Sequence, residues 1–257
     1  MEIYMAKVDS NIIDFGKDEK LNKLKYKETD LVPFEAKNPR QKKFTQYFFD
    51  NKTPLILLNG YAGVGKTFIA LHAALTQVLD QSTHYEKIVI VRSAVESGMS
   101  QGFLPGSLCE KNEPYELPYK LLLKKMFKEP NDSHYANLKT LGCIDFLSTT
   151  YLRGITLDNT IIIVEEAQNL DYTELKTIIT RAGVGSRVVL TGDIAQDDLA
   201  RKKKVSGMGD FMRVVENMDH SYFKTVEFLL EDVVRSGLCS AFLISEYELN
   251  KDSSEEE

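Results

Sequence analysis

Apolar residues along the chain fall into two patterns, short continuous runs and longer stretches with helical spacing. The runs are four or five residues long and are separated by polar or helical segments. They occupy residues 55–58, 87–91, 144–147, 161–164, 187–190 and 225–228. Continuous rather than alternating runs are typical of strands buried on both faces of a parallel sheet.

Helical spacing is clearest in two places. Apolar positions recur every three or four residues over 66–79 and in the segment that Asn38-Pro39 opens. Strands that alternate with helices predict right-handed connections and a doubly wound α/β fold.

Three segments depart from this alternation. Residues 1–37 are charged and weakly periodic, and are expected to form a loosely packed N-terminal extension. Residues 101–139 lack a strand signal and are expected to form a loop and a helix over 116–127. The apolar stripe of that helix comprises Leu117, Leu121, Leu122 and Met126. Residues 246–257 are an acidic tail, which leaves 38–245 as the predicted domain.

Composition and charge argue against several classes of protein. The 257 residues carry a formal net charge of −6, but the acidic tail holds most of it, so local basic patches decide whether nucleic acid binds. No apolar run reaches the roughly 18 residues that cross a bilayer, and the N-terminus does not read as a signal peptide. The three cysteines are widely spaced and no histidine lies near them, which disfavours disulfides and a zinc site. We expect a cytoplasmic protein without a membrane partner.

Residues 60–67, GYAGVGKT, match the G-x-x-x-x-G-K-[ST] phosphate loop. The match follows an apolar strand and precedes a helix, so backbone N–H groups and the helix N-terminus can cradle phosphates. In this motif Lys66 reaches the β- and γ-phosphates, and the Thr67 hydroxyl binds Mg²⁺. The residues expected to contact ATP are Gln41, Gly60, Tyr61, Ala62, Gly63, Val64, Gly65, Lys66, Thr67 and Phe68.

Two glutamates follow the strand at 161–164. Glu165 is expected to hold Mg²⁺ together with Thr67, and Glu166 to orient or deprotonate the attacking water. The two roles can be exchanged, because only the register of the strand end decides between them. The alternative is that both glutamates only complement the dipole of a following helix.

Two glutamines are further candidates. Gln196 follows the strand at 187–190 and is expected to contact the γ-phosphate or the attacking water, although an ordinary turn is the alternative. Gln41 precedes the phosphate loop, and its amide donor and acceptor could recognise adenine.

Six blocks in order resemble the PhoH family. They are NGYAGVGKT, VRSAVESGMSQGFLPGSLCEK, TYLRGITLDN, IIIVEEAQN, TRAGVGSRVVLTGDIAQDDL and EDVVRS, spread over about residues 38–245. The resemblance implies a P-loop NTPase with a RecA-like parallel sheet similar to the core of superfamily 1 helicases. It also implies ATP hydrolysis with Mg²⁺ and a role in RNA metabolism. Glu165 stands where the family more usually has aspartate. Longer relatives carry a PIN nuclease domain, for which this chain is expected to lack room, so ribonuclease activity is not carried over.

A single RecA-like domain has only one face of the usual two-domain ATP site. We therefore expect a head-to-tail ring, and the resemblance implies a hexamer. A neighbouring copy would then supply an arginine finger in trans. The candidates, in order, are Arg235, Arg153 and Arg181.

Nucleic-acid contacts are expected at basic residues near strand ends and in one basic run. The candidates are Arg92, Arg153, Arg201, Lys202, Lys203 and Lys204. The run at 201–204 can equally be a solvated loop, because no aromatic residues for base stacking are interleaved with it.

Two other functions stay open at this point. One is a P-loop kinase for a small molecule, although the segment 101–139 contains no arginine for a substrate lid. The other is a nucleotide-regulated binding module without efficient hydrolysis. Stimulation of ATP turnover by nucleic acid would separate both from a helicase-like ATPase.

Overall fold

The computed structural model describes residues 26–50, 52–93, 108–193 and 207–255. Within these residues six parallel strands form one sheet in the order β3-β2-β4-β5-β1-β6. The strands are β1 (Leu55–Gly60), β2 (Lys87–Arg92), β3 (Ile144–Ser148), β4 (Thr160–Val164), β5 (Arg187–Gly192) and β6 (Phe223–Phe228). Each predicted apolar run lies in a strand, and the predicted α/β class with a parallel sheet is confirmed.

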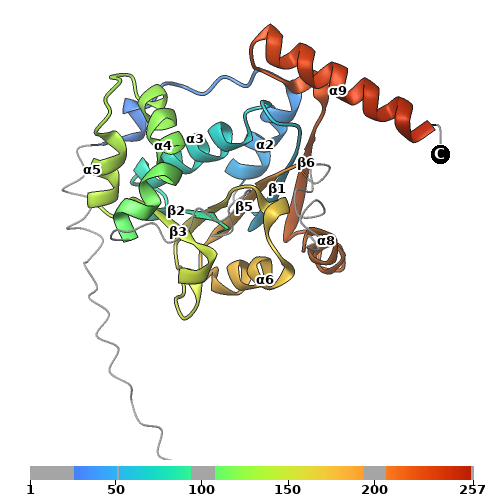
Figure 1. Cartoon of the computed structure of the whole chain (residues 1–257). Coiled ribbons are helices and arrows are strands. Elements are labelled where there is room, and N and C mark those ends of the chain that lie inside the picture. Colours follow the sequence, from blue (N-terminus) through green and yellow to red (C-terminus); the bar gives the residue numbers. More distant parts are fainter. Residues whose placement is uncertain (1–25, 51, 94–107, 194–206, 256–257) are drawn as a thin grey trace, which may run out of the picture.

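Helices connect the strands and cover both faces of the sheet (Figure 1). The α-helices are α2 (Pro39–Phe49), α3 (Lys66–Leu79), α4 (Leu108–Met126), α5 (His134–Thr140), α6 (Tyr172–Arg181), α8 (Met208–Glu216) and α9 (Gly237–Glu255). Short 3₁₀ turns are η1 (Glu28–Asp30), η2 (Thr149–Leu152), η3 (Ala167–Asn169) and η4 (Leu230–Asp232).

The sheet separates two hydrophobic cores. On one face, Ile161 and Ile163 of β4 pack with α2, α3, α4 and α5. On the other, Ile162 and Val164 pack with α6 and α8. Successive side chains of a strand point to opposite faces, and both faces are covered here, which explains the continuous apolar runs.

Helix α2 begins where the sequence predicts. The Asn38 side chain accepts a hydrogen bond from the backbone N–H of Gln41 at 2.8 Å, and Pro39 occupies the first turn. The Asn38 amide also donates to the Asp232 carbonyl at 3.3 Å, so the start of α2 is tied to η4.

Residues 26–34 of the N-terminal extension pack more closely on the domain than the expected loose packing. Leu31 is buried and pairs with Phe127, and the Val32 N–H donates to the Met126 carbonyl at 2.7 Å. The Tyr26 ring packs against Phe127 and His134. These few apolar residues dock on the end of α4 despite the charge around them. Residues 1–25 lie outside the described part of the chain.

The insertion between β2 and β3 is more helical than expected. Helix α4 begins at Leu108 and continues through Pro114 and Pro118, and α5 follows it. The predicted apolar stripe is wrong in its N-terminal half, because Leu117 and Leu121 are exposed. Among the residues of α4 from 113 onward, the buried ones are Glu116, Tyr119, Leu123 and the predicted Met126. In the part of the chain described, no helix is long and apolar enough to span a bilayer.

Candidate nucleotide-binding site

The phosphate loop joins β1 to α3, as its sequence predicts. Gly60 has φ +135°, and a Cβ at this position would lie 2.3 Å from the Phe228 carbonyl oxygen. Gly63 has φ +88° and faces the C-terminal segment of the chain. Both backbone conformations favour glycine. The loop ends at the N-terminus of a 14-residue helix, where N–H groups and the helix dipole attract anions.

The Lys66 ammonium lies over this loop. It donates to the carbonyl oxygens of Gly60 and Tyr61, the second at 2.9 Å. Burial lowers the pKa of Lys66, while the nearby carboxylates of Asp193, Glu166 and Glu165 act to raise it. The Lys66 ammonium group therefore lies near three carboxylates at the carboxyl edge of the sheet, where it could balance the charge of bound phosphates.

Glu165 and Thr67 face each other across the loop. The Thr67 hydroxyl donates to Glu165 Oε2 at 2.7 Å. Glu165 is only 6% exposed, and its second oxygen, Oε1, is buried without a hydrogen-bond partner among the described residues. Burial raises the pKa of this carboxyl to about 7, with the Thr67 hydroxyl opposing the rise. A buried carboxylate oxygen without a donor, beside a hydroxyl, fits a hard cation such as Mg²⁺.

Glu166 adopts a left-handed backbone conformation, with φ 53° and ψ 47°. Its carboxylate is exposed and accepts a hydrogen bond from Gln168 Nε2 at 2.7 Å. The other end of that amide, Gln168 Oε1, accepts from the backbone N–H of Asp193 at 3.1 Å. Gln168 thus links the ends of β4 and β5 and orients the Glu166 side chain.

Sequence reasoning did not select Asp193 or Gln168 as site residues. Asp193 directly follows β5 and is buried, and its charge acts on Lys66. In the sequence, the feature that could have indicated Asp193 as a site residue is its position immediately after an apolar strand. The order of the strands, with β5 between β1 and β4, is what brings it beside the phosphate loop.

Gln41 and Phe68 line a cavity of about 680 Å³ next to the loop. Other lining residues include Phe34, Lys37, Gly65 and Val234. Gln41 is buried; its Nε2 donates to the Val64 carbonyl at 3.0 Å and its Oε1 accepts from Lys37 N–H at 2.8 Å. The structure gives this amide a role in holding the phosphate loop, and its contact to adenine stays a prediction.

The C-terminal segment before α9 closes over the loop of its own chain. The Val234 N–H donates to the Gly63 carbonyl at 3.1 Å, and a Cβ at Gly63 would lie 3.1 Å from Arg235 Cγ. The exposed Arg235 side chain therefore starts beside the phosphate loop in cis. The predicted role of Arg235 as an arginine finger for a neighbouring copy is not required to account for its place beside this loop.

The nucleic-acid candidates are dispersed. Arg92, at the end of β2, lies over the Tyr115 ring at 5.9 Å and is close enough to Glu165 to lower its pKa. Arg153 is exposed after η2, and Arg181 is partly buried at the end of α6. Gln196 and the basic run Arg201, Lys202, Lys203 and Lys204 lie outside the described residues, as does most of the block at 91–111 that carries the family resemblance.

A family model described as PhoH-like protein matches residues 33–248. The chain belongs to this family. The matched range includes the phosphate loop, both glutamates and Arg235.

Relatives of this PhoH-like chain are found in several bacteria. A PhoH-like protein of Mycobacterium leprae is 37% identical over 74% of this chain and 52% of its own length. One of Bacillus subtilis is 35% identical over 75% of this chain and 58% of its own. Protein PhoH of Escherichia coli is 31% identical over 83% of this chain and 58% of its own length. The matched part of the chain therefore spans only about half to three-fifths of each of these relatives.

Among solved structures, the Pif1 helicase from Candida albicans aligns over 76% of this chain and 41% of its own, at 13% identity and a TM-score of 0.38.

Proposed function

We propose that this PhoH-like chain binds ATP with Mg²⁺ and hydrolyses it, and that hydrolysis is coupled to binding or remodelling of RNA or another single-stranded nucleic acid. The observation that carries the proposal is the pair formed by Thr67 and Glu165 beside Lys66. Glu165 is buried and has an oxygen without a donor, Thr67 is partly buried, and the pair lies at the mouth of the phosphate loop. A merely structural acid would not need this placement.

Each site residue then has a distinct task. Lys66 would hold the β- and γ-phosphates, and Thr67 with Glu165 would hold Mg²⁺, which neutralises charge on the transferred phosphoryl group. Glu166, oriented by Gln168, would accept a proton from the attacking water. The cavity lined by Gln41 and Phe68 would take the base and ribose, and its volume lies within the roughly 300–1,000 Å³ of ligand pockets.

The nucleic-acid partner would approach the carboxyl edge of the sheet. Arg92 stands there at the end of β2, close to Glu165, so a phosphate bound by Arg92 could influence the catalytic acids. The exposed Arg153 lies after η2, which continues from the neighbouring strand β3. We assign Arg235 to the nucleotide of its own chain, and Arg153 becomes the first candidate for a finger supplied within a ring of copies.

The test is steady-state ATP hydrolysis with Mg²⁺, with and without single-stranded RNA. Lys66→Ala is expected to abolish turnover in both conditions. Lys176→Ala, which removes an exposed lysine of α6, is the matched control and should turn over like the wild type. Turnover that rises with RNA supports the proposal, and Arg92→Ala should reduce that rise.

Tight binding of ATP without turnover in either condition would contradict the proposal and favour a nucleotide-regulated binding module. Transfer of phosphate to a small acceptor, with no response to RNA, would favour a kinase instead.

A further inference from the structure

Helix α9 presents two different faces. At about 100° per residue, Leu243 and Tyr247 fall on one side, and Leu238, Phe242 and Leu249 fall within about 40° of one another on the opposite side. Leu243 is buried, and the Tyr247 ring meets the Tyr61 ring of the phosphate loop edge-on, with centroids 6.3 Å apart. One face of α9 therefore packs on its own chain, while its C-terminal half extends away from the body (Figure 1).

The opposite face, which we call the outer stripe, consists of Leu238, Phe242 and Leu249. These side chains are 83%, 66% and 68% exposed. Three large apolar side chains in one row on a helix surface are more than scattered exposure, and such rows mark interaction sites. On the same helical wheel Glu246 and Glu248 flank the stripe, one on each side.

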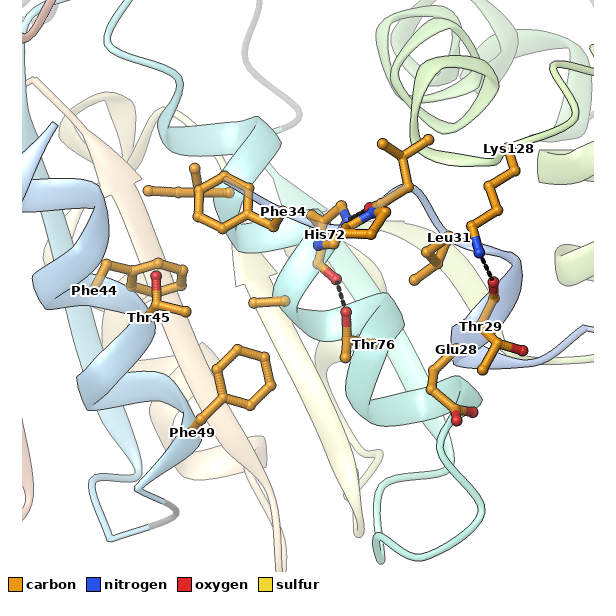
Figure 2. Close-up of a pocket in the computed structure, with 14 residues that line it drawn as sticks. Glu28, Thr29, Leu31, Phe34, Phe44, Thr45, Phe49, His72, Thr76 and Lys128 are labelled. Carbon is orange, nitrogen blue, oxygen red and sulfur yellow. Dashed lines mark hydrogen bonds between the residues drawn. The ribbon is translucent and has the colours of Figure 1, made fainter. Parts of the chain in front are cut away.

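An apolar cavity of about 450 Å³ lies elsewhere on the molecule, between α2, α3 and the segment at 28–34 (Figure 2). Figure 2 shows Phe44 and Phe49 pointing into it from α2 and His72 from α3, the helix that follows the phosphate loop. We call this cavity the α2–α3 groove. Its mainly apolar lining suits the apolar side chains of a docking helix.

The charges around the groove are mainly opposite to those around the outer stripe. Lys128 lines one edge, where its ammonium donates to the Thr29 carbonyl at 2.7 Å, and Glu28 lies on the same edge. On the other edge, Lys42 is exposed on α2, one turn before the lining residue Thr45. Helix α2 contains no acidic residue. A helix with an apolar row between two carboxylates complements an apolar groove near which two lysines stand against the one carboxylate of Glu28.

We propose that the outer stripe of α9 docks in the α2–α3 groove of a second copy of this chain. The contact is heterologous, because the two surfaces are different parts of the same molecule, so each copy offers one helix and one groove. Pairing two α9 helices with each other would instead bring acids against acids.

The contact would join two nucleotide sites. In the copy that supplies the helix, α9 follows Val234 and Arg235 and rests on Tyr61, all of which lie at the phosphate loop. In the copy that supplies the groove, the floor is α3, and His72 also lines the cavity proposed for the nucleotide base. The proposal of the contact itself does not depend on ATP hydrolysis and is tested without it.

The first experiment measures the mass of the full chain in solution by sedimentation or light scattering as a function of concentration. Leu238→Ser with Phe242→Ser, and separately Thr45→Glu in the groove, should each weaken self-association by roughly 10- to 100-fold. Matched controls are Val184→Ser, which changes an equally exposed 83% residue, and Thr177→Glu. Thr177 bonds its hydroxyl to the carbonyl four residues before it, as Thr45 does, each at 2.7 Å. Circular dichroism of every variant confirms that it folds.

The second experiment mixes the two kinds of variant. The outer-stripe variant keeps an intact groove and Thr45→Glu keeps an intact helix, so an equimolar mixture should form dimers, and nothing larger. Wild-type chains that stay monomeric at all concentrations would overturn the proposal. If both variants are monomeric and the mixture forms no dimer, the contact is not α9 in the groove. If only the outer-stripe variant loses association, the contact joins two α9 helices, and the groove assignment is wrong.

Discussion

At the scale of single residues, the site depends on side chains held in constrained positions. Glu166 keeps a positive φ, which costs a non-glycine residue free energy, and Gln168 fixes where its carboxylate points. Glu165 is buried next to Thr67 and has a pKa near 7. The two adjacent glutamates therefore have different environments, as expected if Glu165 is the proposed metal ligand and Glu166 the proposed general base.

Glu166→Gln should slow ATP hydrolysis by about 10²- to 10⁴-fold while ATP binding is retained, because the amide keeps the shape but cannot accept the proton. Single-turnover kinetics measure the rate, and nucleotide titration measures the binding. Gln168→Leu tests the orientation of Glu166, since it removes the amide that holds the carboxylate. A Glu166→Gln variant with wild-type turnover would move the general-base role to another residue.

His72 links the N-terminal segment to α3 through a hydrogen bond from a buried, titratable ring. Its Nε2 donates to the Val32 carbonyl at 2.8 Å, and its ring packs against Phe34 and Phe68. Burial lowers the pKa of His72 below its ordinary value, with the Val32 carbonyl opposing the change. The unfolded chain therefore binds a proton at a higher pH than the folded chain does.

We predict that the stability contributed by neutral His72 is constant above about pH 6.5 and is lost as the pH falls below it. Urea unfolding at several pH values between 5 and 8, for the wild type and His72→Gln, measures this. The glutamine can still donate to Val32, and the ring packing that it loses does not depend on pH, so the pH-dependent part of the difference reports the titration. The difference in unfolding free energy between the two proteins should change with pH in this window, and a constant difference would contradict the prediction.

At the scale of elements, helix ends tie the nucleotide site together. The start of α2 is joined to η4 by Asn38 and by the ion pairs of Arg40 with Glu231 and Asp232. One turn later, Gln41 holds the Val64 carbonyl of the phosphate loop. The beginning of one helix thus positions both the loop and the segment that closes over it.

Asn38→Ala should reduce the free energy of unfolding by about 1 kcal/mol, because the N–H of Gln41 loses its acceptor. Asn38→Ser keeps a capping oxygen and should recover most of that loss, although it lacks the amide that reaches Asp232. Urea midpoints of the two variants measure the difference. Equal stability of Asn38→Ala and the wild type would show that the cap contributes nothing.

At the scale of the whole molecule, the position of Arg235 bears on the ring of copies that we propose. Arg235 lies against Gly63 of its own chain, so an active site can contain both Lys66 and Arg235 from one copy. An arginine that acts only in trans would leave these two residues in different copies of each site.

Mixing Lys66→Ala chains with Arg235→Ala chains separates these arrangements. Each variant alone should be inactive or nearly so. If Arg235 acts on its own nucleotide, the mixture stays as inactive as the separate variants, because no chain has both residues. Recovery of ATP hydrolysis on mixing would assign Arg235 to the neighbouring copy.

The sequence by itself determined the strands, the helices that begin after Asn38 and after the phosphate loop, the loop itself and the two glutamates after β4. These features are local, because a run of apolar residues or a glycine at a required φ acts through its immediate neighbours along the chain. The family resemblance also rests on such blocks. The sequence could not determine what depends on packing between distant segments. Because charged residues dominate the segment 26–37, the sequence did not indicate that Tyr26 and Leu31 pack on the end of α4.

Tertiary structure decided the connections within the site. It brought Asp193 to Lys66 and Gln168 between two strand ends, placed Arg235 against its own loop, and buried Arg187 at the start of β5, where it donates to the Thr53 carbonyl at 3.1 Å. Each of these contacts joins residues that are far apart in the chain, and only the order β4-β5-β1-β6 makes them neighbours. Strand order is set by how whole helices cover the sheet, a global property that no local pattern of residues specifies.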